Sequence, residues 1–285
     1  MAVTIAAPLH PLAKVSQPMP LSISAHFGFT LPHPTDVLLQ FEAAALPEQE
    51  LLVSDTWIPK AMHTARVPAQ DNIGDRFWIH AEGQCRVDYT ATVNVVRQID
   101  ELDLMDRVPP RLLPGEAVKY LFDSRYCQSS NLFDLVESEF AGLEGGAKIA
   151  AMREWVAQNI AYTPGASDAS TTAVDTINAK AGICRDFTHV LVALARASAI
   201  PARYVSCFSP GVTPPDFHAI AEVFLADPKT PQGGTWQLVD ATGMAEPAQT
   251  AKIGVGRDAA DVSFMTVFGA SQFDFSEVTV EEISA

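Results

Sequence analysis

The sequence predicts an α+β protein, in which helices pack on an antiparallel sheet and a β-rich, sandwich-like domain precedes them. Three observations lead to this fold class. Residues 21–105 alternate apolar and polar side chains, as strands do. Residues 131–198 carry apolar side chains three and four positions apart, which is the spacing of helices. Residues 202–242 return to short apolar runs separated by turn residues.

Composition limits the classes of partner. The chain has 285 residues, of which 48% are hydrophobic, so it can build a sizeable core and is long enough for two domains. Its formal net charge of -15 repels phosphate backbones and anionic lipid, so we expect no nucleic-acid or membrane partner. The sequence holds no apolar run of transmembrane length and no basic start of a signal peptide. We therefore expect a cytoplasmic protein with reduced cysteines; after export, its four cysteines could instead form two disulfides.

The domain organisation follows from changes in pattern along the chain. Residues 1–20 contain several prolines and no clear period, and predict an extended arm. Residues 21–105 predict the β-rich N-terminal domain, with one strand around Phe77 and Ile79, a turn near Gly83, and a second strand over residues 87–95. The proline-rich and glycine-rich segment 106–115 predicts a linker, and residues 116–285 predict the second domain.

Helical patterns dominate the first half of the second domain. The segment from Gly145 to Pro164 places Ile149, Met152 and Val156 on one face. A second helix is predicted from about residue 184 to residue 198, because apolar side chains recur along one face and Pro201 follows. Two or three strands come next, and the tail 250–285 shows two further strands whose place in the fold the sequence leaves open.

The stretch "AGICRDFTHV", residues 181–190, holds the first candidate for chemistry. Gly182 permits a tight turn, so Cys184 would begin the second helix among unpaired backbone N–H groups. These groups stabilise a thiolate and can hold an oxyanion. Taken alone, the stretch also fits a buried structural cysteine, so both interpretations stay open at this point.

Two downstream residues strengthen the nucleophile interpretation. His218 opens a strand and Asp240 closes another, with turn residues between them. An antiparallel hairpin that sets residue 218 opposite residue 240 and leaves a loop at 226–232 would bring the two side chains together on one face. An imidazole held by a carboxylate is what a nucleophilic cysteine requires.

The neighbours of Cys184 have simpler explanations. Arg185 and Asp186 predict a helix cap and a salt bridge. His189 lies five residues after Cys184 and predicts a packing or supporting residue. A metal site of Cys184, His189 and His218 would lack a fourth ligand and any metal-type spacing, so we expect neither a metal nor a cofactor.

The segments "GICRDFTHVLVALARASAIPARYVS", "DFHAIAEVFL" and "WQLVDATG" together resemble the transglutaminase-like superfamily, and among its members the bacterial proteins described as cysteine proteases. The resemblance covers most of residues 116–250 and the first 105 residues loosely. It implies a papain-like core with a catalytic triad. Cys184 matches the nucleophile, His218 the general base and acid, and Asp240 the residue that orients the imidazole. The aromatic oxyanion donor of the crosslinking enzymes has no match that the sequence reveals.

The sequence therefore predicts thiol-dependent acyl transfer at an amide bond through an acyl-thioester, with hydrolysis as the main expectation. The substrate would be a peptide, a protein or a small amide. Two alternatives stay open: amide exchange with an amine acceptor, as in a transglutaminase, and a non-catalytic peptide-binding or assembly protein on the same fold. The oligomeric state is not predicted.

Overall fold

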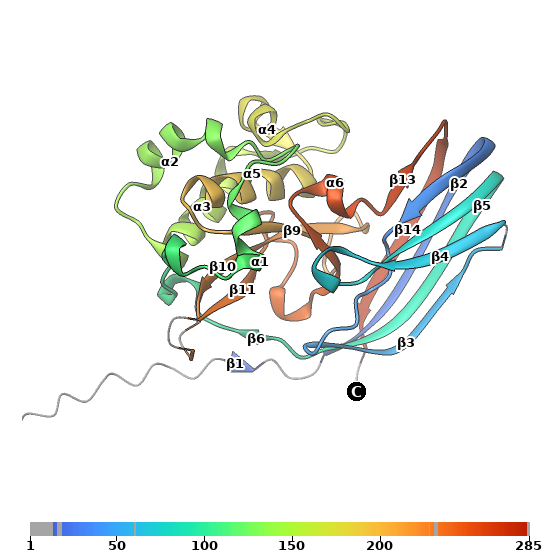
Figure 1. The fold of residues 1–285 in the computed structure, drawn as a ribbon, viewed down its shortest axis with the longest axis horizontal. Coiled ribbons are helices and arrows are strands. Elements are labelled where there is room, and N and C mark those ends of the chain that lie inside the picture. Colours follow the sequence, from blue (N-terminus) through green and yellow to red (C-terminus); the bar gives the residue numbers. More distant parts are fainter. Residues whose placement is uncertain (1–13, 16–18, 60, 228, 231–232, 284–285) are drawn as a thin grey trace, which may run out of the picture.

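The structure, a computed structural model, describes residues 14–15, 19–59, 61–227, 229–230 and 233–283. Figure 1 shows two parts side by side: a group of helices around a short sheet, and a set of long, curved strands. The predicted fold class, α+β with antiparallel sheets, is confirmed. The predicted extended arm over residues 1–20 lies mostly outside the described residues. No helix in the described ranges is long and apolar enough to cross a membrane.

The long strands form a six-stranded sheet, here called the N-terminal sheet. Its order is β13-β2-β5-β3, with β14 also paired to β2 and β4 to β5. The strands are β2 (Met19–Leu39), β3 (Gln49–Trp57), β4 (His63–Pro68), β5 (Asp75–Val95), β13 (Met265–Val267) and β14 (Gln272–Glu282). Alternate residues of β2, among them Leu21, Ile23 and Phe27, are buried on the inner face. The other layer over this face includes Phe208, Ala251 and Ile253 from the second part of the chain.

The prediction of two strands separated by a turn at Gly83 is wrong. Residues 75–95 form the single strand β5, and Gly83 pairs with Leu31 inside it. The positive φ of Gly83 (75°) falls beside a register shift in the partner strand, so this glycine serves an irregularity of the sheet instead of a chain reversal.

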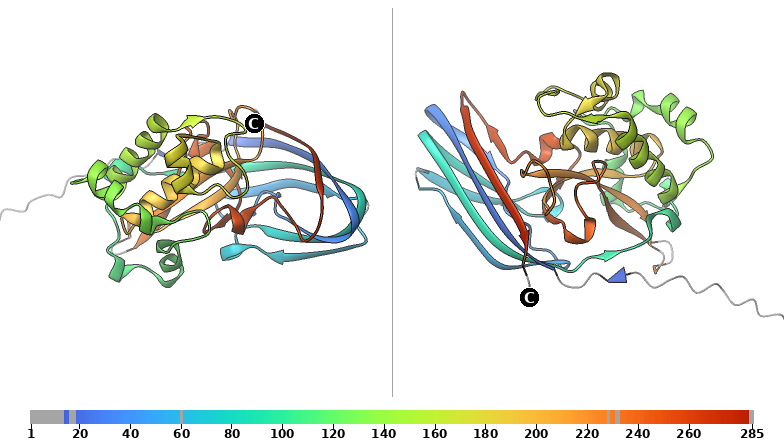
Figure 2. Two further views of the ribbon diagram at one scale, coloured as in Figure 1. Left: turned by 90° about the horizontal axis from the view of Figure 1, so that it is seen from above. Right: turned by 180° about the vertical axis from the view of Figure 1, so that it is seen from behind.

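The end of the chain returns to the N-terminal sheet. Strand β14 pairs with β2 along most of its length, from Gln272 opposite Thr30 to Glu282 opposite Leu21. The views from above and behind in Figure 2 show this last strand alongside the first long one. We propose that residues 265–282 belong to the N-terminal domain, and that the boundaries predicted at residues 105 and 116 divide the remainder.

The second part, here called the helical part, contains a four-stranded antiparallel sheet of order β11-β10-β9-β12. Its strands are β9 (Ala202–Phe208), β10 (His218–Ala226), β11 (Gly234–Val239) and β12 (Ala251–Gly256). Two short pairs complete the strands: β1 (Lys14–Val15) with β6 (Gln98–Ile99), and β7 (Ala161–Tyr162) with β8 (Ala181–Gly182).

The α-helices are α1 (Gly115–Val118), α2 (Phe133–Phe140), α3 (Gly145–Asn159), α4 (Ala173–Ala179), α5 (Cys184–Ala197) and α6 (Ala259–Val262). Single 3₁₀ turns are η1 (Gln70–Asn72), η2 (Leu102–Leu104), η3 (Pro110–Leu112), η4 (Lys119–Leu121), η5 (Ser129–Asn131) and η6 (Pro247–Gln249). The predicted helix from residue 184 to residue 198 is confirmed as α5, which is buried from Asp186 to Arg196.

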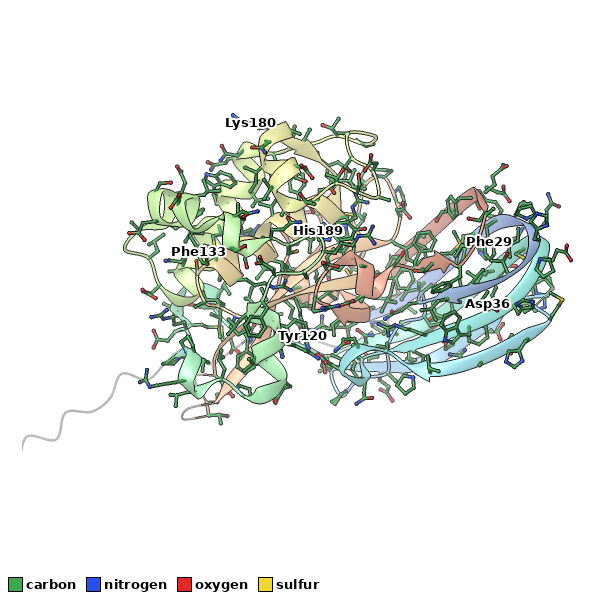
Figure 3. The ribbon with its side chains drawn as sticks, turned by 45° about the horizontal axis from the view of Figure 1, so that its top comes forward. Phe29, Asp36, Tyr120, Phe133, Lys180 and His189 are labelled. Atoms are coloured by element: carbon green, nitrogen blue, oxygen red, sulfur yellow. The ribbon has the colours of Figure 1, made fainter. Side chains whose placement is uncertain are left out.

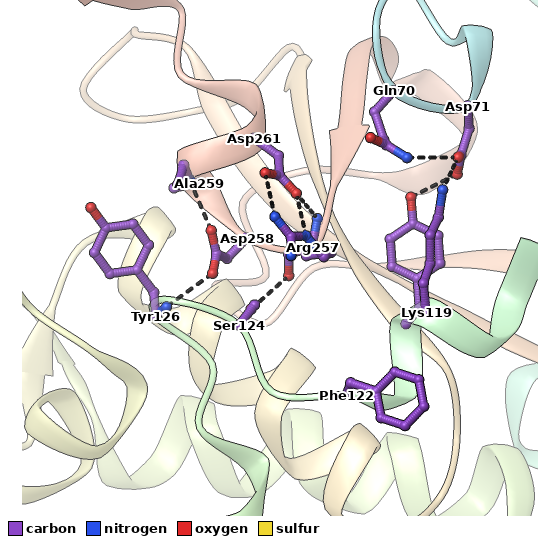
Figure 4. Close-up of polar contacts among 12 residues, drawn as sticks. Gln70, Asp71, Lys119, Phe122, Ser124, Tyr126, Arg257, Asp258, Ala259 and Asp261 are labelled. Carbon is purple, nitrogen blue, oxygen red and sulfur yellow. Dashed lines mark hydrogen bonds and ion pairs between the residues drawn. The ribbon is translucent and has the colours of Figure 1, made fainter.

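A hairpin of the N-terminal sheet is tied to the helical part through Asp71. Its carboxylate accepts a hydrogen bond from Lys119 (Figure 4), and it also accepts from the hydroxyl of Tyr120 at 2.6 Å and from Arg203 at 3.1 Å. Burial and the hydrogen bond to Asp71 raise the pKa of Tyr120, so this phenol stays a neutral donor. The contact fixes the two parts relative to each other.

The four-stranded sheet encloses a buried ionic cluster. Glu222 on β10 is fully buried, and its two carboxylate oxygens accept from Arg203 Nη2 on β9 at 2.6 Å and from Lys252 Nζ on β12 at 2.5 Å. Burial opposes the charge of Glu222, but the two cations outweigh it and lower its pKa to about 2. The carboxylate of Glu222 thus joins two cations across three strands, and these cations also pair with Asp71 and Glu48.

Replacing Glu222 by glutamine should lower the free energy of unfolding by about 3 kcal/mol, because Arg203 and Lys252 would stay buried without their shared counter-charge. Urea unfolding at pH 7 measures the loss. The matched control is Glu277→Gln at an exposed position of β14, expected to change stability by less than about 0.5 kcal/mol. Equal effects of the two variants would contradict the role assigned to Glu222.

The difference in stability between wild type and Glu222→Gln should also depend on pH. The pKa of Glu222 is depressed by folding, so its stabilising contribution is complete above the ordinary glutamate pKa of about 4.3 and is lost as the pH falls toward about 2. The difference in stability between wild type and Glu222→Gln should therefore shrink on acidification over this range.

Candidate active site

Cys184 is the first residue of α5 and is partly exposed. The chain reaches it through a tight approach at Gly182, where an added Cβ would lie 2.7 Å from the Cβ of Asp186. Asp186, with 0% of its surface exposed, accepts a hydrogen bond from the backbone N–H of Ile183 at 2.9 Å. Arg185 forms an ion pair with Asp186 at 2.9 Å, so the predicted cap and salt bridge are confirmed. These contacts hold the turn that presents the thiol.

His218 and Asp240 come together as predicted, but through a different strand register. The structure pairs Ala221 with Val239 and Glu222 with Leu238, which is two residues away from the predicted alignment of 218 with 240. A shift of two residues keeps every side chain on its face, and diagonal neighbours on one face remain within reach of a histidine. The Nε2 atom of His218 lies 3.2 Å from Oδ2 of Asp240.

Asp240 is held by further donors at the end of β11. Its carboxylate accepts from the backbone N–H groups of Thr242 at 2.8 Å and of Ala245 at 2.7 Å. Burial opposes its charge, but the interaction with His218 and these backbone donors lower its pKa, so Asp240 is a carboxylate at neutral pH. A fixed anion is thereby aimed at one nitrogen of the imidazole.

The imidazole of His218 is poised to carry a proton. Burial disfavours its charge, but Asp240 and Cys184 outweigh burial and raise the pKa of His218 to about 9. Since Asp240 contacts Nε2, and Nδ1 has no hydrogen-bond partner among the described residues, Nδ1 is the nitrogen available for proton exchange. A cationic histidine near a thiol favours the thiolate.

Cys184 and His218 line one cleft of about 570 Å³. Its wall comes from α5, from the start of β10, from the loop that joins β9 to β10, and from the segment around α6 that leads back to the N-terminal sheet. Apolar lining side chains include Ile183, Tyr204, Val212, Phe217, Val262 and Phe264. The cleft is large enough to receive several residues of an extended peptide or a small amide.

Tyr162 is a site residue that the sequence did not reveal. The two-residue strand β7 pairs in parallel with β8, which sets Tyr162 opposite Gly182, two residues before Cys184. Burial and the neighbouring Cys184 raise the pKa of Tyr162 to about 12, and both residues line the same cleft. Tyr162 lies 22 residues upstream, near the end of the helical segment predicted from Gly145 to Pro164, and nothing in that pattern marked it as a site residue.

His189 lies behind the cleft, in the interior of the helical part (Figure 3). Its ring stacks on Tyr126 at 5.0 Å, and Nε2 accepts from the backbone N–H of Ala259 at 3.2 Å. Burial lowers the pKa of His189 to about 3, so it is a neutral acceptor. The predicted packing role is confirmed. Asp258 braces the same wall by accepting from the backbone N–H of Tyr126 at 2.9 Å (Figure 4).

The described residues contain no group of three or more histidine, cysteine or acidic side chains arranged to hold a metal ion. The Nε2 atom of His189, which could otherwise bind a metal, accepts a hydrogen bond from the backbone N–H of Ala259.

A helix that begins with a cysteine and packs on an antiparallel sheet bearing histidine and aspartate defines a papain-like, transglutaminase-like class of fold. Comparison with known proteins agrees with this class. A family model described as "Transglutaminase-like superfamily" matches residues 138–241. A solved structure, described as a "Putative Cysteine Protease" from Cytophaga hutchinsonii, superposes with a TM-score of 0.89 at 31% identity, over 96% of this chain and 94% of that chain. The chain belongs to the transglutaminase-like superfamily.

A curated relative, an uncharacterized protein of Mycobacterium leprae, is 31% identical over 128 residues. The match covers 41% of this chain and 42% of the relative, so it spans less than half of that protein's length.

The substitution Asp186→Ala should lower the free energy of unfolding by about 2–4 kcal/mol. The backbone N–H of Ile183 and the guanidinium of Arg185 would both lose their acceptor. The matched control is Asp175→Ala on α4, where an exposed aspartate caps a helix through Thr172 and should cost about 1 kcal/mol. Chemical denaturation of both variants measures the difference. A loss at Asp186 no larger than at Asp175 would show that the turn before Cys184 does not depend on it.

Proposed function

We propose that the protein is a cysteine hydrolase, a peptidase or amidase, that cleaves an amide bond through an acyl-thioester. The observation that carries this proposal is a single cleft that holds Cys184 at a helix N-terminus together with His218, whose ring is fixed by Asp240. The Cytophaga hutchinsonii structure, described as that of a cysteine protease, supports the same class of activity. The substrate would be a peptide, a protein or a small amide.

The first half of the proposed reaction transfers the acyl group to sulfur. The thiolate of Cys184 attacks the amide carbonyl carbon, and a C–S bond forms as the carbonyl oxygen becomes an oxyanion. His218, as imidazolium, gives its Nδ1 proton to the leaving nitrogen, and the C–N bond breaks. An amine leaves and an acyl-thioester remains, with His218 neutral and still held by Asp240.

The second half releases the acyl group. Neutral His218 removes a proton from water, whose oxygen attacks the thioester carbonyl. The C–S bond breaks, the product leaves as a carboxylic acid, and Cys184 and His218 return as thiolate and imidazolium. A primary amine in place of water would give amide exchange. Product analysis with and without added amine separates these two outcomes.

Two donors can hold the oxyanion in this scheme. The backbone N–H of Cys184 is unpaired within the first turn of α5, as in any helix N-terminus. The phenol of Tyr162 lines the same cleft as Cys184 and stays protonated at neutral pH, because burial raises its pKa. We therefore assign Tyr162 as the second oxyanion donor.

We also propose that the protein works in the cytoplasm. A nucleophilic Cys184 must remain a free thiol, and a reducing compartment maintains that state. Detection of the native protein in the cytoplasmic fraction after cell fractionation tests this location, and its recovery outside that fraction would refute it.

Alkylation of Cys184 by iodoacetamide, followed against pH by peptide mass spectrometry, tests the thiolate–imidazolium pair. A thiol without special surroundings titrates near about 8.5, whereas one paired with imidazolium reacts at about pH 6. Wild type should react at the lower pH and His218→Ala should not. Cys127 is an internal control, because burial raises its pKa to about 12. If Cys184 reacts only at alkaline pH in wild type, a peptide-binding role becomes the better explanation.

Cys184→Ala should abolish turnover of any amide substrate while leaving unfolding cooperative.

Tyr162→Phe should lower kcat by about 10²-fold with little change in KM, because the lost hydrogen bond acts on the transition state. Its alkylation profile should still show the low-pH reaction. An unchanged kcat in Tyr162→Phe would remove that residue from the oxyanion site.

A further inference from the structure

We propose that Asp216 selects substrates with a positively charged side chain next to the scissile amide. The inference rests on the proposed function, since it concerns the substrate of the same cleft. Asp216 lies two residues before His218, on the loop between β9 and β10, and lines the cleft with Cys184 and Tyr162. Asp216 is an exposed residue.

The orientation of the carboxylate is set by its own backbone. Oδ1 of Asp216 accepts a hydrogen bond from the N–H of Phe217 at 2.8 Å. Burial raises the pKa of the Asp216 carboxyl, and the hydrogen bond from the backbone of Phe217 opposes this rise. No lysine, arginine or histidine of the described ranges forms an ion pair with Asp216, so the carboxylate brings an uncompensated negative charge to the cleft wall.

The cleft also has cationic lining residues, namely Arg125, Arg185 and, in the proposed mechanism, His218 beside Asp240. Arg185 pairs with the buried carboxylate of Asp186 at 2.9 Å and donates to the backbone carbonyl of Asp168 at 2.6 Å. The guanidinium of Arg125 lies over the ring of Tyr126 at 5.0 Å. Asp216 is the acidic side chain among the described lining residues, so a basic side chain of a substrate would pair with it.

The carboxylate acts at the place where the chemistry would occur. Asp216 lines the same cleft as Cys184 and Tyr162 and stands two residues before His218 in the chain. A side chain close enough to meet Asp216 would therefore belong to a residue beside the bond that Cys184 attacks. A cation there would be attracted and a carboxylate repelled, and both effects contribute to specificity.

The surroundings of Asp216 suit lysine or arginine. Val212, Pro214 and Phe217 line the same stretch of the wall. Lysine and arginine lay a methylene stem along apolar surface and keep the charged group at its end, so stem and head would each find a matching partner here. The occupant that the observations favour is thus a basic residue of a peptide.

Two series of probes test this inference on the full chain, one for each side of the scissile amide. Peptidyl acyloxymethyl ketones with lysine, norleucine or glutamate next to the ketone report the acyl side through the rate of Cys184 alkylation. Internally quenched peptides with the same three residues after the scissile bond report the leaving side through kcat/KM. Lysine should exceed norleucine by about fivefold in at least one series, as expected for a partly exposed charge pair, and glutamate should be slowest.

Variants assign any preference to Asp216. Asp216→Asn should reduce the lysine preference to less than about twofold, and Asp216→Lys should make glutamate the fastest probe. The matched control, Asp134→Asn at an exposed position of α2, should keep the wild-type order. High salt should weaken the preference in wild type, because an exposed pair is screened.

The outcomes separate the two proposals. Equal rates with lysine, norleucine and glutamate in both series, while Cys184 reacts, would overturn the role of Asp216 and leave the hydrolase proposal intact. A lysine preference that survives in Asp216→Asn would also overturn it. Failure of every probe to alkylate Cys184, together with no cleavage of any peptide, would overturn the proposed function itself.

Discussion

The packing of α5 against β9 and β10 is the constraint on which the candidate site depends. Every residue of α5 from Asp186 to Arg196 is buried, and Thr188 donates a hydrogen bond from its hydroxyl to the carbonyl of Ala219 at 2.9 Å. A helix enclosed on all sides cannot slide or rotate without opening voids. The thiol at its N-terminus is therefore fixed relative to the strand that begins at His218.

Buried ion pairs favour one register of strand β10. Glu222 lies four residues after His218 and joins Arg203 of β9 to Lys252 of β12. A slip of β10 would leave buried charges unpaired at a cost of several kcal/mol, so the ionic cluster favours one alignment. The same alignment brings His218 within 3.2 Å of Asp240. A cluster outside the cleft thus helps to determine the geometry within it.

The N-terminal sheet contributes to the cleft as well as to the fold. Phe264, which lines the cleft, stacks on Phe217 at 4.8 Å and contacts Phe27 of β2 at 5.5 Å. This wall therefore rests on the inner face of the long strands. The chain then continues into β13 and β14, which pair with β2. The β-rich part is in this way an integral support of the site.

The sequence by itself determined the elements whose pattern is local. Apolar spacing predicted α5, and the alternation around His218 and Asp240 predicted a hairpin that brings them together, because a register error of two residues does not change the face of a strand. Long-range pairing decided the rest. Gly83 looked like a turn because its partner Leu31 is 52 residues away, and Tyr162 became part of the site only when two residues of β7 paired with β8. Contacts between distant segments leave no periodic signal in either one, so only the tertiary structure could show them.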